Sequence, residues 1–301
     1  MQRRRFAKVA AWLGAGVAAS ARVSAAQPAG AVSDTAPAAQ SPATEPTKES
    51  ADAHHRAAIQ KYDSLTGGDK LVIGMLVYPG MFLQDLIGPL TVFEALMNKD
   101  IHLLWKNTDP VGNEEGQPKA LVPITPTTAF KDCPPRLDVL FVPGGVPGTL
   151  TMMEDPEVLA FLAQQGATAR YVTSVCTGSL ILGAAGLLKG YRATSYWATR
   201  DLLKELGAIP SKARVVVDRN RITGGGVTAG LDFGLKLVSL LRSPAYAKTV
   251  QLYLEYDPAP PYNAGSPDKA PRLAVEFLTE MYAGMVDATR AIARRARSRW
   301  A

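Results

Sequence analysis

Residues 171–179 read Tyr-Val-Thr-Ser-Val-Cys-Thr-Gly-Ser and join a predicted strand to a predicted helix. The first five residues are aromatic, β-branched or small, which favours a strand, and the apolar stretch after Gly178 favours a helix. A strand that leads directly into a helix is the repeating unit of α/β proteins. We therefore expect this junction to lie in a parallel sheet that is covered by helices.

The same alternation of strand and helix signals extends from Lys70 to about Leu254. The first strand is apolar on both faces, as in parallel sheets that have helices on both sides. Strands are predicted at residues 70–78, 101–106, 137–142, 171–175, 214–218 and 221–223, and helices at 88–97, 156–169, 178–188, 197–206, 227–241 and 244–254. The chain is thus predicted to form one α/β domain, a three-layer sandwich with a parallel sheet in the middle layer.

The composition of the 301 residues argues against several classes of protein. The formal net charge of +6 comes from basic clusters near the two ends, and the middle of the chain is slightly acidic, so no basic face for nucleic acid is expected. No apolar run of about eighteen residues is present, which argues against a membrane span. Two cysteines and three histidines are too few for a disulfide scaffold or a cysteine-rich metal site. We predict neither a metal nor another cofactor.

Residues 1–26 have the pattern of an export signal. A basic start is followed by an apolar stretch and by the small residues Ser24-Ala25-Ala26. Residues 3–8, Arg-Arg-Arg-Phe-Ala-Lys, resemble the twin-arginine signal. The pattern predicts an exported, periplasmic protein, and a Sec signal or an uncleaved basic anchor stays open as an alternative.

The chain divides into four predicted segments. After the signal, residues 27–68 are rich in Ala and Pro and predict a disordered linker, in which residues 52–62 have the pattern of a short helix. Residues 69–268 form the α/β domain, and residues 269–301 form an amphipathic C-terminal helix. The apolar stripe of that helix is expected to cover either its own domain or a partner subunit.

Cys176 is the leading candidate for a catalytic nucleophile. A tight turn from strand to helix lifts a side chain clear of the sheet, and such turns carry nucleophiles in hydrolases. The turn also places the sulfur near a helix N-terminus, which favours a thiolate. The alternative is a buried structural cysteine, because free cysteines are among the most buried residues.

Three further features point to the same edge of the sheet. Gly144 and Gly145 end a neighbouring strand and are candidates to offer backbone N–H groups to negative charge, unless they only form a tight loop. Asp85 follows the first strand and is a candidate general acid or base, with helix capping as the alternative. Cys133 lies in a proline-rich loop, and a disulfide between it and Cys176 is the less favoured reading because it would remove the thiolate.

Several of these motifs resemble the ThiJ/PfpI family of the class I glutamine amidotransferase-like superfamily, and in particular its isonitrile hydratase group. The resemblance covers about Lys70 to Asp268 and implies a flavodoxin-like fold. It rests on Asp85-Leu-Ile-Gly-Pro89, Val142-Pro-Gly-Gly145, Val175-Cys-Thr-Gly-Ser179, Leu182-Gly-Ala-Ala-Gly-Leu-Leu188, Thr223-Gly-Gly-Gly226 and Glu255-Tyr-Asp-Pro-Ala-Pro-Pro-Tyr-Asn-Ala-Gly-Ser-Pro-Asp268.

The resemblance implies a hydro-lyase that converts an isonitrile, R–NC, into an N-substituted formamide through a thioimidate. Cys176 would be the nucleophile, Asp85 the general acid and base, and Thr177 a supporting hydroxyl. The family reaction needs no metal or organic cofactor. Its members form homodimers, so the expected partners are a small-molecule substrate and a second copy of the chain.

The sequence departs from the family pattern at three positions. Thr177 stands where peptidase-like relatives have a histidine, which disfavours a Cys-His hydrolase. Tyr196 precedes Trp197 where many relatives have a histidine, and Ile87 stands where a small hydroxyl residue is frequent. We expect Ile87 and Tyr196 to form part of the substrate pocket wall.

Other functions remain open on the same fold, because a fold alone does not determine function. One is a ligand-binding or redox-sensing module in which Cys176 is not catalytic. Another is a glyoxalase-like or deglycating activity, which would be expected to need a histidine beside the cysteine. A DNA-binding regulator is disfavoured, because only about thirty residues follow Asp268 and a helix-turn-helix region needs at least two helices.

Overall fold

The computed structural model describes residues 48–112 and 120–298. The predicted signal peptide, residues 1–26, lies outside these ranges. Within them, no helix combines the length and the apolar character that crossing a membrane requires. The described residues belong to a single unit that begins at Lys48.

The described end of the predicted linker is helical. Helix α1 spans Lys48–Lys61, and the short helix α2 spans Asp63–Thr66. Neither helix buries a residue. The alanine, lysine and glutamate residues of α1 favour a helix by local propensity alone, and α1 overlaps the short helix predicted at residues 52–62 but begins four residues earlier.

A seven-stranded sheet forms the middle layer, in the order β3-β2-β1-β4-β5-β9-β8. Every strand pair in it is parallel except β8 and β9, which form an antiparallel hairpin at one edge. The strands are β1 Leu71–Leu76, β2 Lys99–Trp105, β3 Thr128–Ala129, β4 Val139–Val142, β5 Tyr171–Val175, β8 Val215–Asp218 and β9 Arg221–Gly224. The mostly parallel sheet confirms the predicted fold class.

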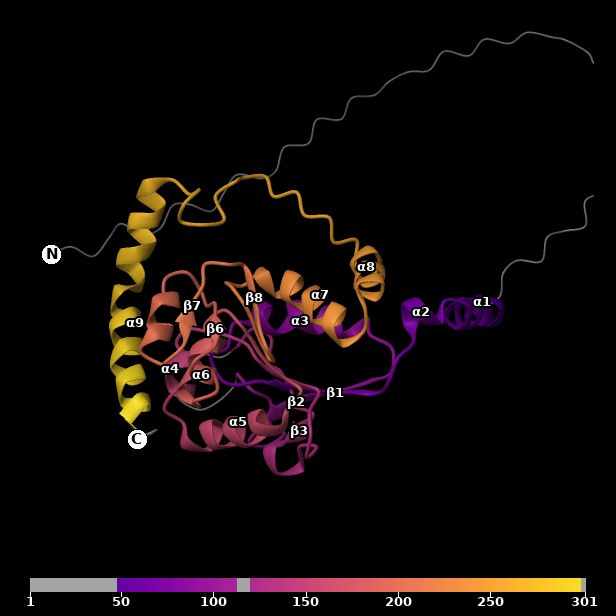
Figure 1. The fold of residues 1–301 in the computed structure, drawn as a ribbon, viewed down its shortest axis with the longest axis horizontal. Coiled ribbons are helices and arrows are strands. Elements are labelled where there is room, and N and C mark those ends of the chain that lie inside the picture. Colours follow the sequence, from indigo (N-terminus) through magenta and orange to yellow (C-terminus); the bar gives the residue numbers. More distant parts are fainter. Residues whose placement is uncertain (1–47, 113–119, 299–301) are drawn as a thin grey trace, which may run out of the picture. The chain divides into compact units, whose positions relative to one another are not determined.

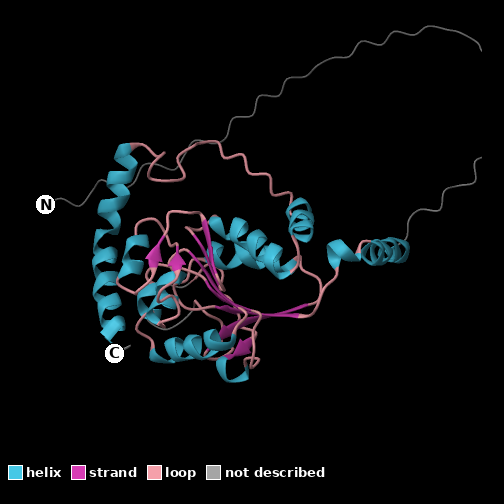
Figure 2. Ribbon diagram, viewed as in Figure 1, coloured by secondary structure: helices cyan, strands magenta, loops and turns pink. Residues whose placement is uncertain are grey.

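Helices cover both faces of this sheet (Figure 2). Helix α3 packs against α7, which also contacts α8, whereas α6 contacts α4 and α5. The helices are α3 Leu83–Glu94, α4 Gly148–Met152, α5 Pro156–Thr168, α6 Gly178–Ala184, α7 Ala229–Leu241 and α8 Pro244–Tyr253. Because α6 follows β5 directly, the junction around Cys176 lies at the carboxyl edge of the central strands, where ligands bind in such sheets.

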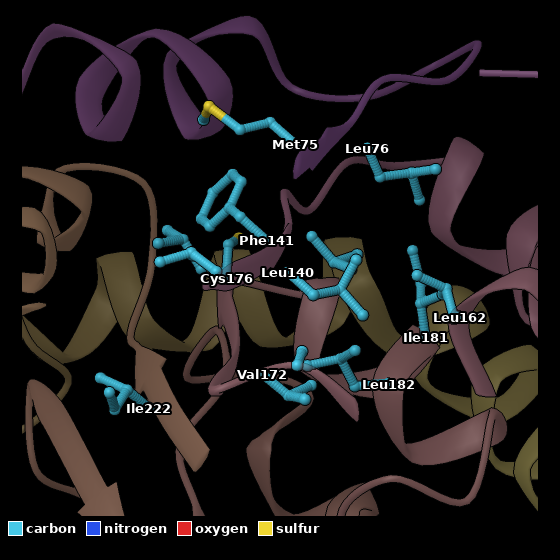
Figure 3. Packing of buried hydrophobic residues seen from close by; sticks show 14 of the residues in the cluster. Met75, Leu76, Leu140, Phe141, Leu162, Val172, Cys176, Ile181, Leu182 and Ile222 are labelled. Carbon is cyan, nitrogen blue, oxygen red and sulfur yellow. The ribbon is translucent and has the colours of Figure 1, made fainter. Parts of the chain in front are cut away.

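The core lies between the sheet and its helices. All four residues of β4 are buried, and Phe141 from this strand meets Phe93 and Phe233 from the two helices above it. The ring centroids of these three phenylalanines are 5.7–6.5 Å apart. Cys176 lies beside Phe141 and belongs to the same buried cluster, so its sulfur is in contact with the core (Figure 3).

Helix α9, Arg272–Ser298, contacts α4, α6 and the 3-10 helix η2 along one side of the domain (Figure 1). Its buried residues are Thr289, Ile292, Ala293 and Ala296, which share one face because they are spaced by three or four positions. The C-terminal half of the amphipathic helix therefore covers its own domain.

Short elements account for most differences from the sequence prediction. The helix predicted at residues 197–206 is only the 3-10 helix η2, Arg200–Lys204. Helix α3 begins at Leu83, ahead of the predicted start at residue 88, because Gly88 and Pro89 resemble a loop but lie inside the helix. Helix α4, the 3-10 helix η1 and strand β3 had not been predicted, nor had the small sheet of β6, Arg192–Ala193, and β7, Ile209–Pro210.

Candidate active site

Cys176 occupies the turn between β5 and α6 with a φ of 57°, in the left-handed region that residues with a side chain rarely adopt. Its N–H group donates to the carbonyl oxygens of Gly224 and Gly225, at 3.1 and 2.8 Å. Its carbonyl oxygen accepts hydrogen bonds from the hydroxyls of Ser179, at 3.2 Å, and Ser195, at 3.1 Å. These four bonds hold the strained turn, as the predicted nucleophile elbow requires.

Asp85 lies in the first turn of α3 and is fully buried. Its Oδ2 atom accepts a hydrogen bond from the Gly144 N–H group at 3.1 Å, and its Oδ1 atom accepts none that meets the same geometry within the described chain. Phe82 is the N-cap of this helix and forms no side-chain cap. Asp85 therefore does not cap α3, which removes the alternative reading of this residue.

The Asp85 carboxyl and the Cys176 thiol interact with each other. Burial raises the pKa of Asp85 to about 6, although the interactions with the thiol and with the Gly144 N–H group work in the opposite direction. The carboxyl is thus poised to exchange a proton near neutral pH, which is the property of an efficient general acid or base.

The surroundings of Cys176 favour the protonated thiol over the predicted thiolate. Only 7% of the residue is exposed, and burial raises the pKa of the thiol far above its ordinary value. The negative charge of Asp85 raises this pKa further, and hydrogen bonds from the N–H groups of Val227 and Thr177 lower it only in part. The helix terminus behind the sulfur, α6, has seven residues and does not outweigh burial.

Gly144 and Gly145 do not offer free N–H groups, contrary to the sequence prediction. The Gly144 N–H group donates to Asp85, and the Gly145 N–H group donates to the Thr177 hydroxyl at 3.0 Å. A Cβ atom on Gly144 would lie 2.6 Å from Thr177 Oγ1 and 2.8 Å from Asp85 Oδ2, so only glycine fits there. The two glycines position Asp85 and Thr177, whereas Val227 and Thr177 provide the N–H groups at the sulfur.

Tyr196 stands close enough to Cys176 for the charges of the two groups to interact. Burial and the neighbouring Tyr282 hydroxyl raise the pKa of Tyr196. The ring of Tyr282, from α9, contacts the Tyr196 ring edge-on with centroids 5.5 Å apart. Gly226 leaves room for Tyr196, since a Cβ atom there would lie 2.8 Å from its ring. The C-terminal helix therefore reaches the surroundings of the thiol, which the sequence analysis had not foreseen.

Ile87 is partly buried on α3, two residues after Asp85. Residues two positions apart on a helix point to different faces. The structure therefore does not place Ile87 on the face that carries Asp85, and its predicted role in the pocket wall stays a prediction.

The second cysteine, Cys133, is also free and follows the 3-10 helix η1, Phe130–Asp132. Because both thiols are free, the structure has no Cys133–Cys176 disulfide. Burial alone raises the pKa of Cys133 to about 11. In the described part of the chain, no three His, Cys, Asp or Glu side chains gather as a metal site would require.

Several residues near the site escaped the sequence analysis. Val227 follows the Thr223-Gly-Gly-Gly226 motif that ends β9, and this motif was the available signal for a second loop at the sulfur. Ser195 precedes Tyr196 in a loop whose path the sequence did not reveal. Tyr78 and Thr149 are buried near Thr177, and no local sequence pattern predicts a role for either residue.

Comparison with known proteins agrees with the fold. The profile of the DJ-1/PfpI family matches residues 72–240, and the chain belongs to this family. The isonitrile hydratase of Pseudomonas putida is 53% identical over 206 residues, which cover 68% of this chain and 87% of that enzyme.

Two further relatives show the range of the family. The crystal structure of a THiJ/PfpI family protein from Pseudomonas syringae has a TM-score of 0.72 and 51% sequence identity, and the match covers 78% of this chain and 94% of that one. The HTH-type transcriptional regulator GbdR of Pseudomonas aeruginosa is 32% identical over 173 residues, which cover 55% of this chain and 45% of the regulator. Membership of the family therefore does not by itself determine an activity.

The comparison with isonitrile hydratase corrects one prediction. The similarity to that enzyme conflicts with the predicted signal peptide and periplasmic location. Residues 1–26, on which the prediction rested, resemble an export signal in composition, but composition alone is a weak basis for export. The prediction of a signal peptide and a periplasmic protein is therefore wrong.

Proposed function

We propose that this protein is a hydro-lyase that hydrates an isonitrile to an N-substituted formamide. The observation that carries the proposal is the pairing of the Cys176 thiol, on a strained turn, with the buried Asp85 carboxyl. The 53% identity to an isonitrile hydratase supports the same reaction class. The side chain R of the substrate is left open by these observations.

In the first stage, the sulfur of Cys176 adds to the terminal carbon of the isonitrile. The S–H bond breaks, Asp85 takes the proton, and the S–C bond forms. Asp85 then delivers this proton to the same carbon, which gives the thioimidate R–N=CH–S–Cys176. No group leaves in this stage, so the adduct contains all atoms of the substrate.

In the second stage, water adds to the thioimidate carbon while Asp85 takes one of its protons. Asp85 passes this proton to the nitrogen, which gives R–NH–CH(OH)–S–Cys176 and leaves the carboxyl ionised again. The C–S bond then breaks, the O–H proton returns to the sulfur through Asp85, and R–NH–CHO is released. The sum of the two stages is R–NC plus water giving the formamide, without oxidation or reduction.

The electrostatics of the site suit this sequence of steps. A protonated thiol carries the hydrogen that the isonitrile carbon needs, and a carboxyl with a pKa of about 6 is ionised at neutral pH and can accept it. When the C–S bond breaks, negative charge develops on the sulfur. The N–H groups of Val227 and Thr177 lower the pKa of the thiol and so stabilise this charge.

The proposal is tested by incubating the purified protein with an alkyl isonitrile and measuring the formamide by chromatography. We expect turnover in the wild type and in Cys133→Ala, which serves as the matched control because it removes the other free thiol. Turnover should be lost in Cys176→Ala and in Asp85→Asn. Turnover that survives Cys176→Ala in a folded protein would contradict the covalent mechanism.

A second candidate function is a ligand-binding or redox-sensing module on the same fold. The deep burial and the raised pKa of Cys176 favour ligand binding within this candidate and disfavour redox sensing, because a protonated, buried thiol is oxidised slowly. A wild-type protein that binds an isonitrile in calorimetry but releases no formamide would support this candidate over the hydratase.

We also propose that the protein forms a homodimer through helix α9. Leu273, Phe277 and Met281 lie four residues apart on this helix and are more than half exposed. Such a stripe is typical of a surface that is covered by another chain. Light scattering is expected to show a dimer in the wild type and a monomer in Phe277→Glu, and a monomeric wild type would contradict the proposal.

A further inference from the structure

A line of buried hydroxyl groups connects the candidate active site to the core. Tyr78, just after β1, is fully buried and donates its hydroxyl proton to the Pro143 carbonyl oxygen at 2.9 Å. Thr149, from α4, is close enough to Tyr78 for its side chain to lower the pKa of that residue, and it lies 2.7 Å from Thr177, measured between the two Oγ1 atoms. Both threonines are 2% exposed.

The hydroxyl groups of this line also bind the loop at residues 143–145. The Tyr78 hydroxyl donates to the Pro143 carbonyl oxygen, and the neighbouring Thr149 hydroxyl lowers the pKa of Tyr78. Thr149 and Thr177 share one hydrogen bond between their hydroxyls, and the Thr177 oxygen also accepts from the Gly145 N–H group at 3.0 Å.

The line holds the loop at residues 143–145 at both of its ends. Tyr78 binds the carbonyl oxygen of Pro143, and Thr177 binds the N–H group of Gly145. Between these two points, the N–H group of Gly144 is hydrogen-bonded to Asp85 Oδ2. The position of this N–H group, and with it the position of the carboxyl, depends on the loop being fixed at its ends.

We propose that Tyr78 and Thr149 are positioning residues that orient the Asp85 carboxyl through the loop at residues 143–145. The inference rests on the proposed hydratase function for its kinetic test. Neither residue touches the reacting atoms. When the Thr149 hydroxyl is removed, the acceptor that remains for the Thr177 hydroxyl proton among the described residues is the Gly145 carbonyl oxygen. It lies 3.5 Å from Thr177 Oγ1, a distance at which a hydrogen bond is weak.

The kinetic test compares Thr149→Val with Thr149→Ser. Valine keeps the shape of the side chain without the hydroxyl, whereas serine keeps the hydroxyl. We expect Thr149→Val to lower kcat about tenfold with little change in KM, because small displacements of a catalytic group cost rate rather than binding. We expect the pKa in the acid limb of its kcat/KM profile to rise, since a loosened Gly144 N–H group stabilises the carboxylate less.

Two controls separate positioning from a general loss of structure. Thr149→Ser should restore wild-type kcat and the wild-type pH profile. Thr289→Val makes the same change at another buried threonine, whose hydroxyl donates to the Met285 carbonyl oxygen at 2.7 Å, and it should leave both unchanged. Wild-type kcat and pH profile in a folded Thr149→Val protein would overturn the proposal, and Tyr78→Phe provides a second variant if Thr149→Val does not fold.

A readout that needs no turnover keeps this proposal distinct from the proposed function. In a Cys133→Ala background, the alkylation rate of Cys176 by iodoacetamide is measured against pH. Since the charge of Asp85 raises the pKa of this thiol, displacement of Asp85 in Thr149→Val should move the profile to lower pH, and Thr149→Ser should not move it. An unmoved profile in Thr149→Val would overturn the positioning role, whereas a wild type without turnover would overturn only the hydratase function.

Discussion

The two free cysteines of this protein are both shielded from solvent, but their surroundings differ. Cys133 follows a 3-10 helix in a proline-rich loop, and burial is the only cause of its raised pKa. Cys176 occupies a left-handed turn and has a carboxyl and two N–H groups as neighbours. The difference shows that burial does not mark a reactive thiol here. The reactive thiol is distinguished by polar neighbours that supply a base and stabilise a developing charge.

The largest effect is expected when each thiol is removed in turn. Cys176→Ala should lower kcat/KM for an isonitrile by about 10³-fold or more, as loss of a covalent nucleophile does. Cys133→Ala should stay within about twofold of the wild type, because Cys133 has no acid–base partner. Steady-state kinetics with both variants check this, and equal losses in the two would remove the distinction between the cysteines.

A smaller effect is expected when the base beside Cys176 is neutralised. Asp85→Asn keeps an oxygen for the Gly144 N–H group but removes proton transfer, so kcat should fall by about 10²-fold. The pKa of Cys176 should fall at the same time, because the charge of Asp85 raises it. Kinetics and the alkylation profile measure the two changes, and full activity of Asp85→Asn would rule out the carboxyl as the base.

The pH dependence should reveal the carboxyl near Cys176. The pKa of Asp85 is about 6, and the base form is the ionised one. Activity is therefore expected to fall about fivefold between pH 6 and pH 5, since half of the carboxyl is ionised at its pKa, and to fall about tenfold with each further pH unit. A kcat/KM profile that is flat down to pH 4.5 would show that this group does not act as the base.

The smallest effect concerns stability. Burial raises the pKa of Asp85 from 3.8 to about 6, so the folded state binds this proton more tightly than the unfolded state does. The resulting stabilisation is present below pH 4 and is lost as the pH rises through 6. Asp85→Asn should therefore stabilise the fold by about 1 kcal/mol at pH 7 and by less at pH 4.5. Thermal unfolding at the two pH values checks this, and a destabilised variant at pH 7 would contradict it.

Local sequence patterns were sufficient to predict the strands of the sheet other than β3 and the turn at Cys176. Alternating strand and helix signals set the order of the elements, and a cysteine between a strand and a glycine marked the elbow. Asp85 could be placed because the carboxyl ends of parallel strands meet at one edge. Helix α4 escaped prediction because its start, Pro147-Gly148, resembles a loop.

The protonation state and the supporting contacts could not be read from the sequence. The pKa of Cys176 depends on how completely the assembled core and the Asp85 charge surround the sulfur. Thr149 lies 28 residues from Thr177 in the chain, and only tertiary packing brings their hydroxyls together. The same holds for Tyr282, which reaches Tyr196 from the C-terminal helix.

The most direct test of the account is rapid acid quenching of the enzyme during turnover, followed by mass spectrometry of the peptide that contains Cys176. The mechanism predicts an adduct whose added mass equals that of the whole isonitrile, on Cys176 and absent from Cys133. Formamide production without any adduct on Cys176, together with turnover in Cys176→Ala, would contradict it.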